Sequence, residues 1–528
     1  MRVTEVETVL QSIVEQVQPL RQAYMLAEWE AAVSGTPENN RHNQETQAAY
    51  MRFWADPARL ALLKRLDEAG AAADSLQARQ LRVFHLLAAE NQQDEDTIQR
   101  LTQLEADVRG RYYNFRADVD GRQLSDNELD DVLAKSGDTE LVREAWEASR
   151  QVGGQVASSV RELARTRNAA ARRQGYRDHF ARSLALNEMD ETELFSIFDE
   201  LKAATDEPFA RLKAEIDRER ARHFHIAESD LEPWHYGDRF FSSPPPTGDV
   251  ALDRLFTGQD PVALALATYD GLGLDVRDIL DRSDLYARPG KNQHAFCIDI
   301  DHSGDVRTLN NLEPNHRWNE TLLHELGHAV YDKFQDSAMP WALRTPPHTL
   351  STEAIALLMG SLTYDADWLT QIAGVPPSEA AHVAQAAAAQ ARAQRLIFTR
   401  WVLVMTNFER ALYADPDGDL DNLWWETVER FQGLRRPAGR QHPDWAAKIH
   451  VALYPVYYHN YELGYLVAAQ LRHHLDAAAG GLVNRPAAGR WLVDNFFRPG
   501  NREPWSRHIL TATGEPLTPR YFVESFAG

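Results

Sequence analysis

Apolar residues recur at spacings of three and four along most of the chain. The clearest segments in its first half are ETQAAYMRFW (45–54), DSLQARQLRVFHLLAAE (74–90) and DTIQRLTQLEADVRGRYYNF (96–115). This spacing gives an α-helix one apolar face, so it predicts helices that pack on a shared core. Clusters of Gly, Pro, Asn and Asp predict loops at SGTPENN, VDGRQ and KSGDTE. Residues 1 to about 230 are therefore predicted to be almost entirely helical.

The pattern changes between residues 292 and 312. In NQHAFCIDIDHSGDVRTLNNL, apolar and polar residues alternate in FCIDID, and HSGD is typical of a turn, which predicts a short β-hairpin. Helical spacing then returns, notably in the Ala-rich AQAAAAQARAQRLIFTRW (384–401), whereas FFSSPPPTGD (240–249) indicates a surface loop or linker. The chain is therefore predicted to be mainly α with a minor sheet, in two lobes.

Composition narrows the setting of the protein. The chain of 528 residues carries 56 Lys and Arg against 78 Asp and Glu, a net charge of −22, which argues against nucleic acid as a partner. Cys297 is the only cysteine, so no intramolecular disulfide forms. Glutamates interrupt the N-terminal segment where a signal peptide has an apolar run, and no apolar stretch is long enough for a membrane span. We expect a cytoplasmic protein that does not bind membranes, with an oligomeric state that these patterns leave open.

The stretch LLHELGHAVYDKF (322–334) carries the strongest chemical signal. His324 and His328 are four residues apart with Glu325 between them, so in a helix both imidazoles can reach one ion. HTLSTEAIALLMG then offers Glu353 as a third ligand, 25 residues after His328. Two histidines, one glutamate and an open water position make the hydrolytic zinc arrangement. On spacing alone, the alternative is a pair of packed or solvated histidines that share a helix.

Beyond this motif, the sequence resembles the angiotensin-converting enzyme family of peptidyl-dipeptidases, which are gluzincin metallopeptidases. The family has a His-Ala pair on an active-site strand, and His294 and Ala295 stand thirty residues before His324. PWALR (340–344) and Thr352-Glu353-Ala354-Ile355 resemble family motifs around the third ligand.

The resemblance continues downstream. LWWETVERFQGL (423–434) and AKIHVALYPVYYHNYELGY (447–465) are similar to family segments, with one extra residue between His450 and the tyrosines. Weaker similarity at RTRNAAARRQGYRDHF (165–180) extends into the N-terminal half. The resemblance therefore covers most of the chain and is most specific over 290–465.

The resemblance implies a set of roles. It implies one zinc ion per chain, with His324, His328 and Glu353 as ligands and Glu325 as the base that activates the zinc-bound water. It implies that Tyr461 donates to the oxyanion, and that His450 and His294, with Ala295 beside it, hold the substrate backbone. Lys448 and Tyr458 match residues that bind the substrate's C-terminal carboxylate. The implied function is hydrolysis of short peptides with release of C-terminal dipeptides.

The implied fold is one peptidase domain over residues 1–528. It is an elongated, two-lobed helical body with a deep central cleft. Residues 1 to about 240 form a helical lid or first lobe, and residues from about 250 to 528 form the zinc-binding lobe, with a small β-sheet beside the zinc helix.

Two departures from the family bear on this picture. Tyr236 stands where the family has a Gln that binds the substrate carboxylate, which weakens the expectation of strict dipeptide release. Leu357 stands where the family has an Asp that supports the zinc histidines, so that support must come from elsewhere. The alternatives are a thimet-type endo-oligopeptidase, a zinc carboxypeptidase, and an inactive peptide-binding homologue.

Overall fold

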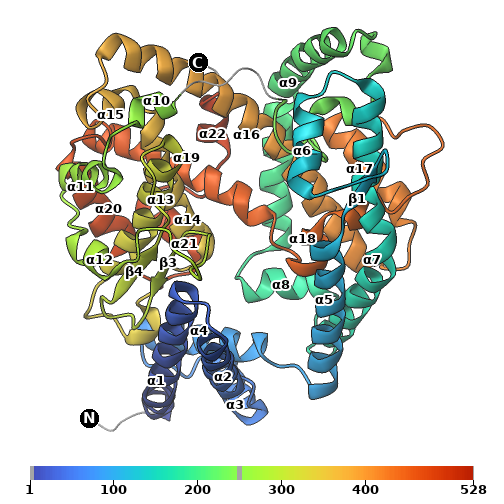
Figure 1. The fold of residues 1–528 in the computed structure, drawn as a ribbon. Helices are drawn as coiled ribbons and strands as arrows, with labels where there is room; N and C mark the ends of the chain where they lie inside the picture. The colour runs from blue at the N-terminus through green and yellow to red at the C-terminus, as the bar shows by residue number, and fades with distance from the viewer. Residues whose placement is uncertain (1–4, 246–251, 527–528) are drawn as a thin grey trace. The chain divides into compact units, whose positions relative to one another are not determined.

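The computed structural model describes residues 5–245 and 252–526, and it is mainly helical (Figure 1). The strands within this part form two antiparallel two-stranded sheets. The expected mainly α fold with a minor sheet is therefore confirmed. The expected linker at 240–249 has neither helix nor strand over residues 240–245, and its remaining residues lie outside the described part of the chain.

The chain divides into two compact units, each made of three separate segments. The first unit comprises Met1–Gln92, Val250–Ala387 and Leu463–Phe522, and the second comprises Gln93–Asp249, Ala388–Glu462 and Val523–Gly528. Three helices run through points where the chain passes from one unit to the other: α16 (Pro377–Ala414), α19 (His459–Ala479) and α22 (Arg520–Glu524). The lid, the zinc-binding lobe and the cleft between them stay predictions.

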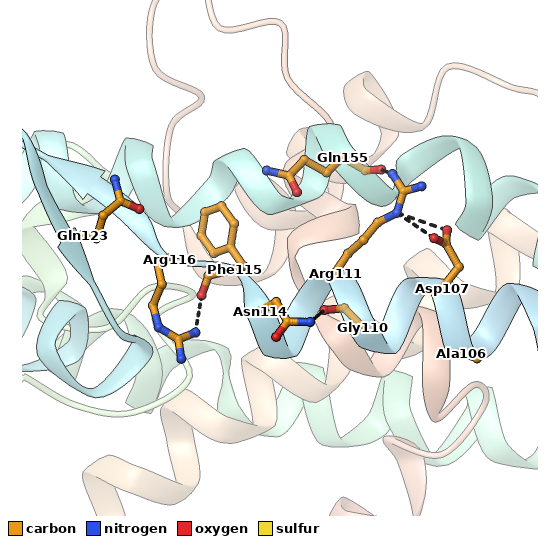
Figure 2. A pocket seen from close by; sticks show the side chains of 9 residues that line it. All are labelled: Ala106, Asp107, Gly110, Arg111, Asn114, Phe115, Arg116, Gln123 and Gln155. Atoms are coloured by element: carbon orange, nitrogen blue, oxygen red, sulfur yellow. Dashed lines mark hydrogen bonds and ion pairs between the residues drawn. The ribbon is translucent and has the colours of Figure 1, made fainter.

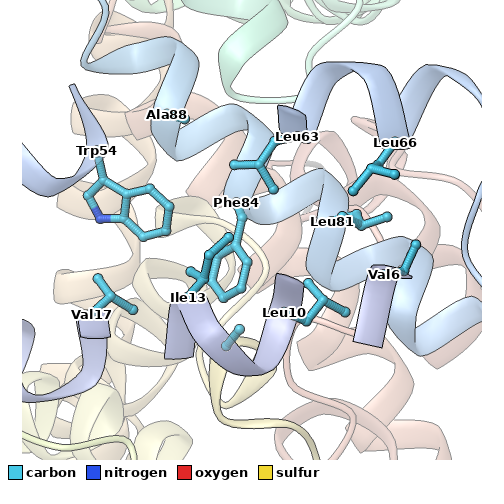
Figure 3. Packing of buried hydrophobic residues seen from close by; sticks show 11 residues of the cluster. Val6, Leu10, Ile13, Val17, Trp54, Leu63, Leu66, Leu81, Phe84 and Ala88 are labelled. Carbon is cyan, nitrogen blue, oxygen red and sulfur yellow. The ribbon is translucent and has the colours of Figure 1, made fainter. Parts of the chain in front are cut away.

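The first unit begins with four helices that share one hydrophobic cluster, to which Ala342 also belongs. These helices are α1 (Glu5–Val33), α2 (Pro37–Trp54), α3 (Pro57–Glu68) and α4 (Ser75–Glu90). Val6, Leu10, Ile13 and Val17 recur along α1 at the predicted spacings and pack against a cluster that includes Phe84 of α4 (Figure 3). Helices α2, α3 and α4 begin at ordinary capping residues. Pro37 of SGTPENN therefore already belongs to α2, with the Thr36 hydroxyl as its cap.

The middle of the first unit carries the zinc motif. Its elements are α10 (Asp253–Phe256), α11 (Pro261–Leu272), α12 (Arg277–Arg282), β3 (Phe296–Asp299), β4 (Val306–Leu309), α13 (His316–Lys333), α14 (Thr349–Gly360) and α15 (Ala366–Gln371). The predicted hairpin is present, with Phe296 opposite Leu309 and Asp299 opposite Val306. It packs against α13 (Figure 1), so the expected small sheet beside the zinc helix is confirmed. The unit also contains α20 (Pro486–Leu492) and α21 (Trp505–Thr513).

The second unit is built around the long helix α7. Its elements are α5 (Glu95–Asn114), β1 (Ala117–Val119), β2 (Arg122–Leu124), α6 (Asp126–Lys135), α7 (Thr139–Arg173), α8 (His179–Leu186), α9 (Glu191–Phe224), α17 (Leu420–Gln432) and α18 (Ile449–Leu453). Buried Trp146 of α7 lies against the rings of Trp234 and Trp425.

One loop expected in this unit is a hairpin. VDGRQ connects β1 and β2, with Asp120 and Gly121 at φ of 50° and 72°. Positive φ at both central residues is the geometry that Asp-Gly favours in a tight hairpin turn. The predicted loop is present as the turn, but the two strands beside it were not predicted, because strands of three residues are too short to show alternation.

Candidate metal centre

The two histidines of the motif face a glutamate from the neighbouring helix. His324 and His328 lie one turn apart on α13, and Glu353 lies in the first turns of α14. His324 Nε2 is 3.7 Å from Glu353 Oε1, and His328 Nε2 is 3.5 Å from Glu353 Oε2. One ligand atom from each residue lies within 4.8 Å of the others. All three predicted ligands are thus brought together within the first unit.

The chemistry of this cluster fits a metal cation. Burial lowers the pKa of His324 to about 4 and, with the charge of His324, that of His328 to about 3. Both imidazoles are therefore neutral at neutral pH, the form that binds metal. The separations from Glu353 are too long for hydrogen bonds, so no shared proton holds the three groups together.

Zinc matches the spacing of the three groups. Ligands at bonds of about 2.0–2.1 Å around a tetrahedral zinc are separated by about 3.3–3.4 Å, close to the two distances seen here. Burial also raises the pKa of Glu353 to about 6, because removal from water disfavours the charged carboxylate.

Glu325 lies beside the cluster without belonging to it. Its side chain is buried, and no described residue donates a hydrogen bond to it. Burial, and then the charge of Glu353, raise the pKa of Glu325 to about 8. A bound cation acts in the opposite direction and favours the ionised carboxylate. Glu325 is therefore a titratable group whose proton affinity depends on the charge held by its neighbours.

Glycine residues allow α13 and α14 to approach closely. A Cβ atom on Gly327, within the HELGH motif, would lie 2.8 Å from the Cα atom of Ala356. On α19, a Cβ atom on Gly464 would lie 3.5 Å from Cγ of Glu353. Only a residue without a side chain permits the approach at Gly327. The Gly of the motif therefore contributes to the site by bringing the helix of Glu353 onto the helix of the histidines.

Thr352 supplies a support that sequence reasoning missed. Its Oγ1 lies 2.8 Å from His328 Nδ1, the nitrogen opposite the one that faces Glu353. When His328 Nδ1 donates this hydrogen bond, its Nε2 keeps a lone pair for a metal. The only signal in the sequence was the hydroxyl residue directly before Glu353. Leu357 cannot support the histidines as the family's Asp does. For His328, Thr352 of the same helix, α14, provides that support instead.

We predict that Thr352→Val weakens zinc binding by about 10–100-fold, because His328 loses the acceptor that fixes its ring and tautomer. Competition with a chromogenic chelator measures the affinity directly. Thr352→Ser keeps the hydroxyl and should restore most of it. Thr349→Val, at an exposed position of the same helix, is the matched control. Equal affinities for all four proteins would contradict this role.

Two family models match the chain. The model of angiotensin-converting enzyme matches residues 2–215, and that of peptidase family M3 matches residues 281–528, which include the His-His-Glu cluster and Glu325. Both are families of zinc-dependent gluzincins.

The two matches support an angiotensin-converting-enzyme-like gluzincin family for this chain. This gluzincin is therefore a metallopeptidase that acts on peptides. No curated protein matches the chain significantly. The segment with the most specific resemblance, 290–465, falls in the family M3 match, whereas the weaker N-terminal similarity falls in the angiotensin-converting enzyme match.

The strand on which the resemblance places His294 and Ala295 begins two residues later in this gluzincin. His294 and Ala295 precede β3, and His294 is exposed, with its backbone N–H donating to Asn292 Oδ1 at 3.0 Å. The placement of His294 and Ala295 within the strand was therefore wrong, since ladder pairing starts at Phe296 opposite Leu309. Over residues 5–245 and 252–526, β3 pairs with no strand other than β4, so its other edge is not covered by a strand.

The remaining predicted residues of the gluzincin gather around aromatic rings of the second unit. Lys448 Nζ lies 5.1 Å from the ring centroid of Phe240, 5.4 Å from that of Trp401 and 5.8 Å from that of Tyr458. Burial lowers the pKa of Lys448 to about 8. No described residue forms a hydrogen bond or ion pair with this ammonium group. Lys448 is therefore a cation held by aromatic faces and without a carboxylate partner in the described chain.

His450 and the two tyrosines belong to the same aromatic group. The ring of Tyr458 lies 4.9 Å from that of His450 and 5.4 Å from that of Tyr461. Burial, and then the charge of Lys448, lower the pKa of His450 to about 4, so its ring is neutral. Its buried Nδ1 has no hydrogen-bond partner among the described residues.

The hydroxyl group of Tyr236 is already hydrogen-bonded to two neighbouring side chains. Its hydroxyl donates to Asp217 Oδ1 at 2.7 Å and accepts from Lys213 Nζ at 2.7 Å. The side chain is 3% exposed. A hydroxyl that is buried and fully engaged does not replace the family's Gln as a donor to a substrate carboxylate.

A cavity of about 650 Å³ in the second unit is separate from these residues. Figure 2 shows its lining, which comes mainly from α5, with Gln155 of α7. Arg111 is already paired there, with Asp107 Oδ1 at 3.1 Å and the Gln155 carbonyl at 2.7 Å (Figure 2). The cavity contains none of the predicted site residues.

Within the described chain, no helix combines the length and apolar character needed to cross a membrane.

Proposed function

We propose that this gluzincin hydrolyses short peptides and releases C-terminal dipeptides, with one zinc ion per chain held by His324, His328 and Glu353. The observation that carries the proposal is the convergence of two neutral imidazoles and a carboxylate beside the buried Glu325. A zinc ion held there would supply Lewis acidity toward water and the peptide carbonyl.

Glu325 is the proposed general base. It takes a proton from the attacking water and then gives a proton to the leaving amine, so one carboxyl group serves both halves of the reaction. Its burial favours this role, because a carboxyl group with a pKa raised toward neutrality both accepts and returns a proton readily.

Tyr461 and His450 are the proposed donors to the developing oxyanion and the substrate backbone. The Tyr461 phenol is a neutral donor, and the lowered pKa of His450 leaves it neutral as well. Tyr461 lies three residues before Gly464 on α19, the glycine that packs against Glu353. Each donor of this kind contributes about 10²–10³-fold to turnover.

Backbone contacts near His294 and Ala295 are the proposed means of holding the peptide. Both residues lead into β3, whose outer edge has no strand partner in the described chain. An extended peptide can add to such an edge through main-chain hydrogen bonds, which select for extended shape rather than for sequence.

Lys448 and Tyr458 are the proposed anchors of the substrate's C-terminal carboxylate. The Lys448 ammonium group, which has no carboxylate partner among the described residues, supports this assignment. Endo-cleavage is the second candidate, and two observations favour it. The family model that spans the motif is that of peptidase family M3, and Tyr236 is engaged with Asp217 and Lys213. We propose the cytoplasm as the compartment, because one cysteine requires no oxidising environment.

We predict that a free-acid decapeptide loses successive C-terminal dipeptides and that its C-terminal amide is cleaved about 10–100-fold more slowly, because the amide lacks the charge that Lys448 binds. Mass spectrometry of timed digests identifies the products. Lys448→Met should remove the advantage of the acid, whereas Lys135→Met, at an exposed position, should keep it.

The same digests separate the alternatives. Internal cuts in both peptides indicate an endo-oligopeptidase, and single released residues indicate a carboxypeptidase. Intact peptides after incubation with zinc-loaded protein indicate a peptide-binding homologue.

A further inference from the structure

Glu320 shares a helix face with the metal ligands. It lies four residues before His324 on α13, as His324 lies four residues before His328, so the three side chains follow one another along the same face. A Cβ atom on Gly360 of α14 would lie 3.5 Å from both Glu320 Cγ and His324 Cβ. Glu320 and His324 therefore border the same small space between α13 and α14.

The carboxylate of Glu320 is held in place on one side only. Its Oε2 accepts a hydrogen bond from the Tyr364 hydroxyl at 3.0 Å, and the Tyr364 ring packs edge-on against His316 at 4.6 Å. No described residue donates to Oε1. The side chain is half-buried, so it is neither sealed in the core nor freely solvated.

Within the part of the chain that the structure describes, no positively charged side chain compensates Glu320. Among the described residues, no Lys, Arg or His forms an ion pair with it, and burial raises its pKa. Carboxylates that are buried to this extent are normally paired with a cation, because removing the charge from water without a partner is unfavourable. A cation from outside the described chain would supply the missing partner.

The position of Glu320 on α13 determines which residues of a bound peptide it could contact. Four residues of α-helix rise by about 6 Å, and an extended peptide advances by about 3.3–3.6 Å per residue. Glu320 is thus about two substrate residues away from the metal centre. We propose that Glu320 binds an ammonium or guanidinium group of the peptide, within about two residues of the cleaved bond. This inference rests on the proposed function of the site.

A positional scan tests this role. A series of neutral decapeptides is prepared in which one Met is replaced by Lys at each position, because the two side chains have similar length and differ in charge. We expect the wild type to prefer Lys at one position by about 10-fold or more in kcat/KM, as a charge-assisted hydrogen bond implies. Glu320→Gln keeps an acceptor for Tyr364 and should lose this preference while cleaving the Met peptides within about threefold of wild type.

Glu313→Gln, at an exposed position before α13, is the matched control and should keep the preference. N-acetylation of the peptides distinguishes the source of the cation. A preference that survives acetylation comes from a side chain, and one that disappears comes from the terminal amine.

The outcomes separate this inference from the proposed function. Turnover of the Met peptides without any dependence on Lys or the terminal amine overturns the role of Glu320 and leaves the peptidase function intact. If no peptide is cleaved, equilibrium binding of the Lys and Met peptides to the zinc-loaded protein tests the role of Glu320 instead. Tighter binding of a cationic peptide that Glu320→Gln abolishes supports the role, and equal binding of Lys and Met peptides overturns it.

Discussion

Glu325→Gln is expected to lower kcat by about 10²–10⁴-fold while zinc stays bound with the affinity of the wild type. The carboxylate lies beside the three ligand groups and is not one of them, so the substitution removes the proton acceptor and keeps the ligands. Gln has nearly the same shape as Glu, which limits changes in packing at this buried position. Turnover of a decapeptide and zinc content by elemental analysis are the two measurements.

Two comparisons make this result specific to Glu325. Glu313→Gln changes the same chemical group at an exposed position and should leave kcat within about twofold of wild type. Glu353→Gln alters a ligand and should lower zinc affinity together with turnover. Retention of more than about a tenth of kcat in Glu325→Gln would assign the base to another group.

Gly327→Ala is expected to lower the free energy of unfolding by about 1–3 kcal/mol, because the added methyl group overpacks the contact between α13 and α14. Its Cβ atom would lie 2.8 Å from Ala356 Cα and 3.2 Å from Ala356 N, atoms of the backbone that cannot move aside singly. Separation of the helices also moves Glu353 away from the imidazoles, so zinc affinity should fall. Denaturant unfolding of the zinc-free protein and chelator competition measure the two effects.

Gly360→Ala is the matched control on the facing helix. A Cβ atom there would lie no closer than 3.4 Å to its neighbours, and Ala gains helix propensity over Gly. This variant should be as stable as the wild type or more stable. Equal destabilisation by both substitutions would show that loss of Gly, rather than the close approach at Gly327, matters.

Local patterns predicted much of what the structure contains. The apolar spacing in DSLQARQLRVFHLLAAE and DTIQRLTQLEADVRGRYYNF identified α4 and α5, and the alternation in FCIDID identified β3. These features were readable because apolar residues repeat about every 3.6 residues in a helix and every two in a strand. The β1–β2 hairpin was missed because three-residue strands hardly alternate, although its Asp-Gly turn was visible.

The candidate site was predicted in part. The three groups that converge were named from spacing and family resemblance, as was Glu325. Thr352 was not recognised, because its contact with His328 depends on how α14 is turned against α13. The engagement of Tyr236 by Lys213 was missed for a related reason. A residue that occupies a family position reveals nothing about which neighbours already use its hydroxyl.

The interleaving of the two units has a consequence for biosynthesis. The first unit takes segments from the beginning, the middle and the end of the chain, and the second takes the segments between them. Truncation at a single point cannot isolate either unit, so a separately produced half requires rearranged segments. During translation, the residues up to 92 emerge long before residues 463–522 that complete their unit. Pairing across such sequence separation slows folding, and the exposed apolar faces of the early helices must wait, free or held by chaperones, until the last segment has left the ribosome.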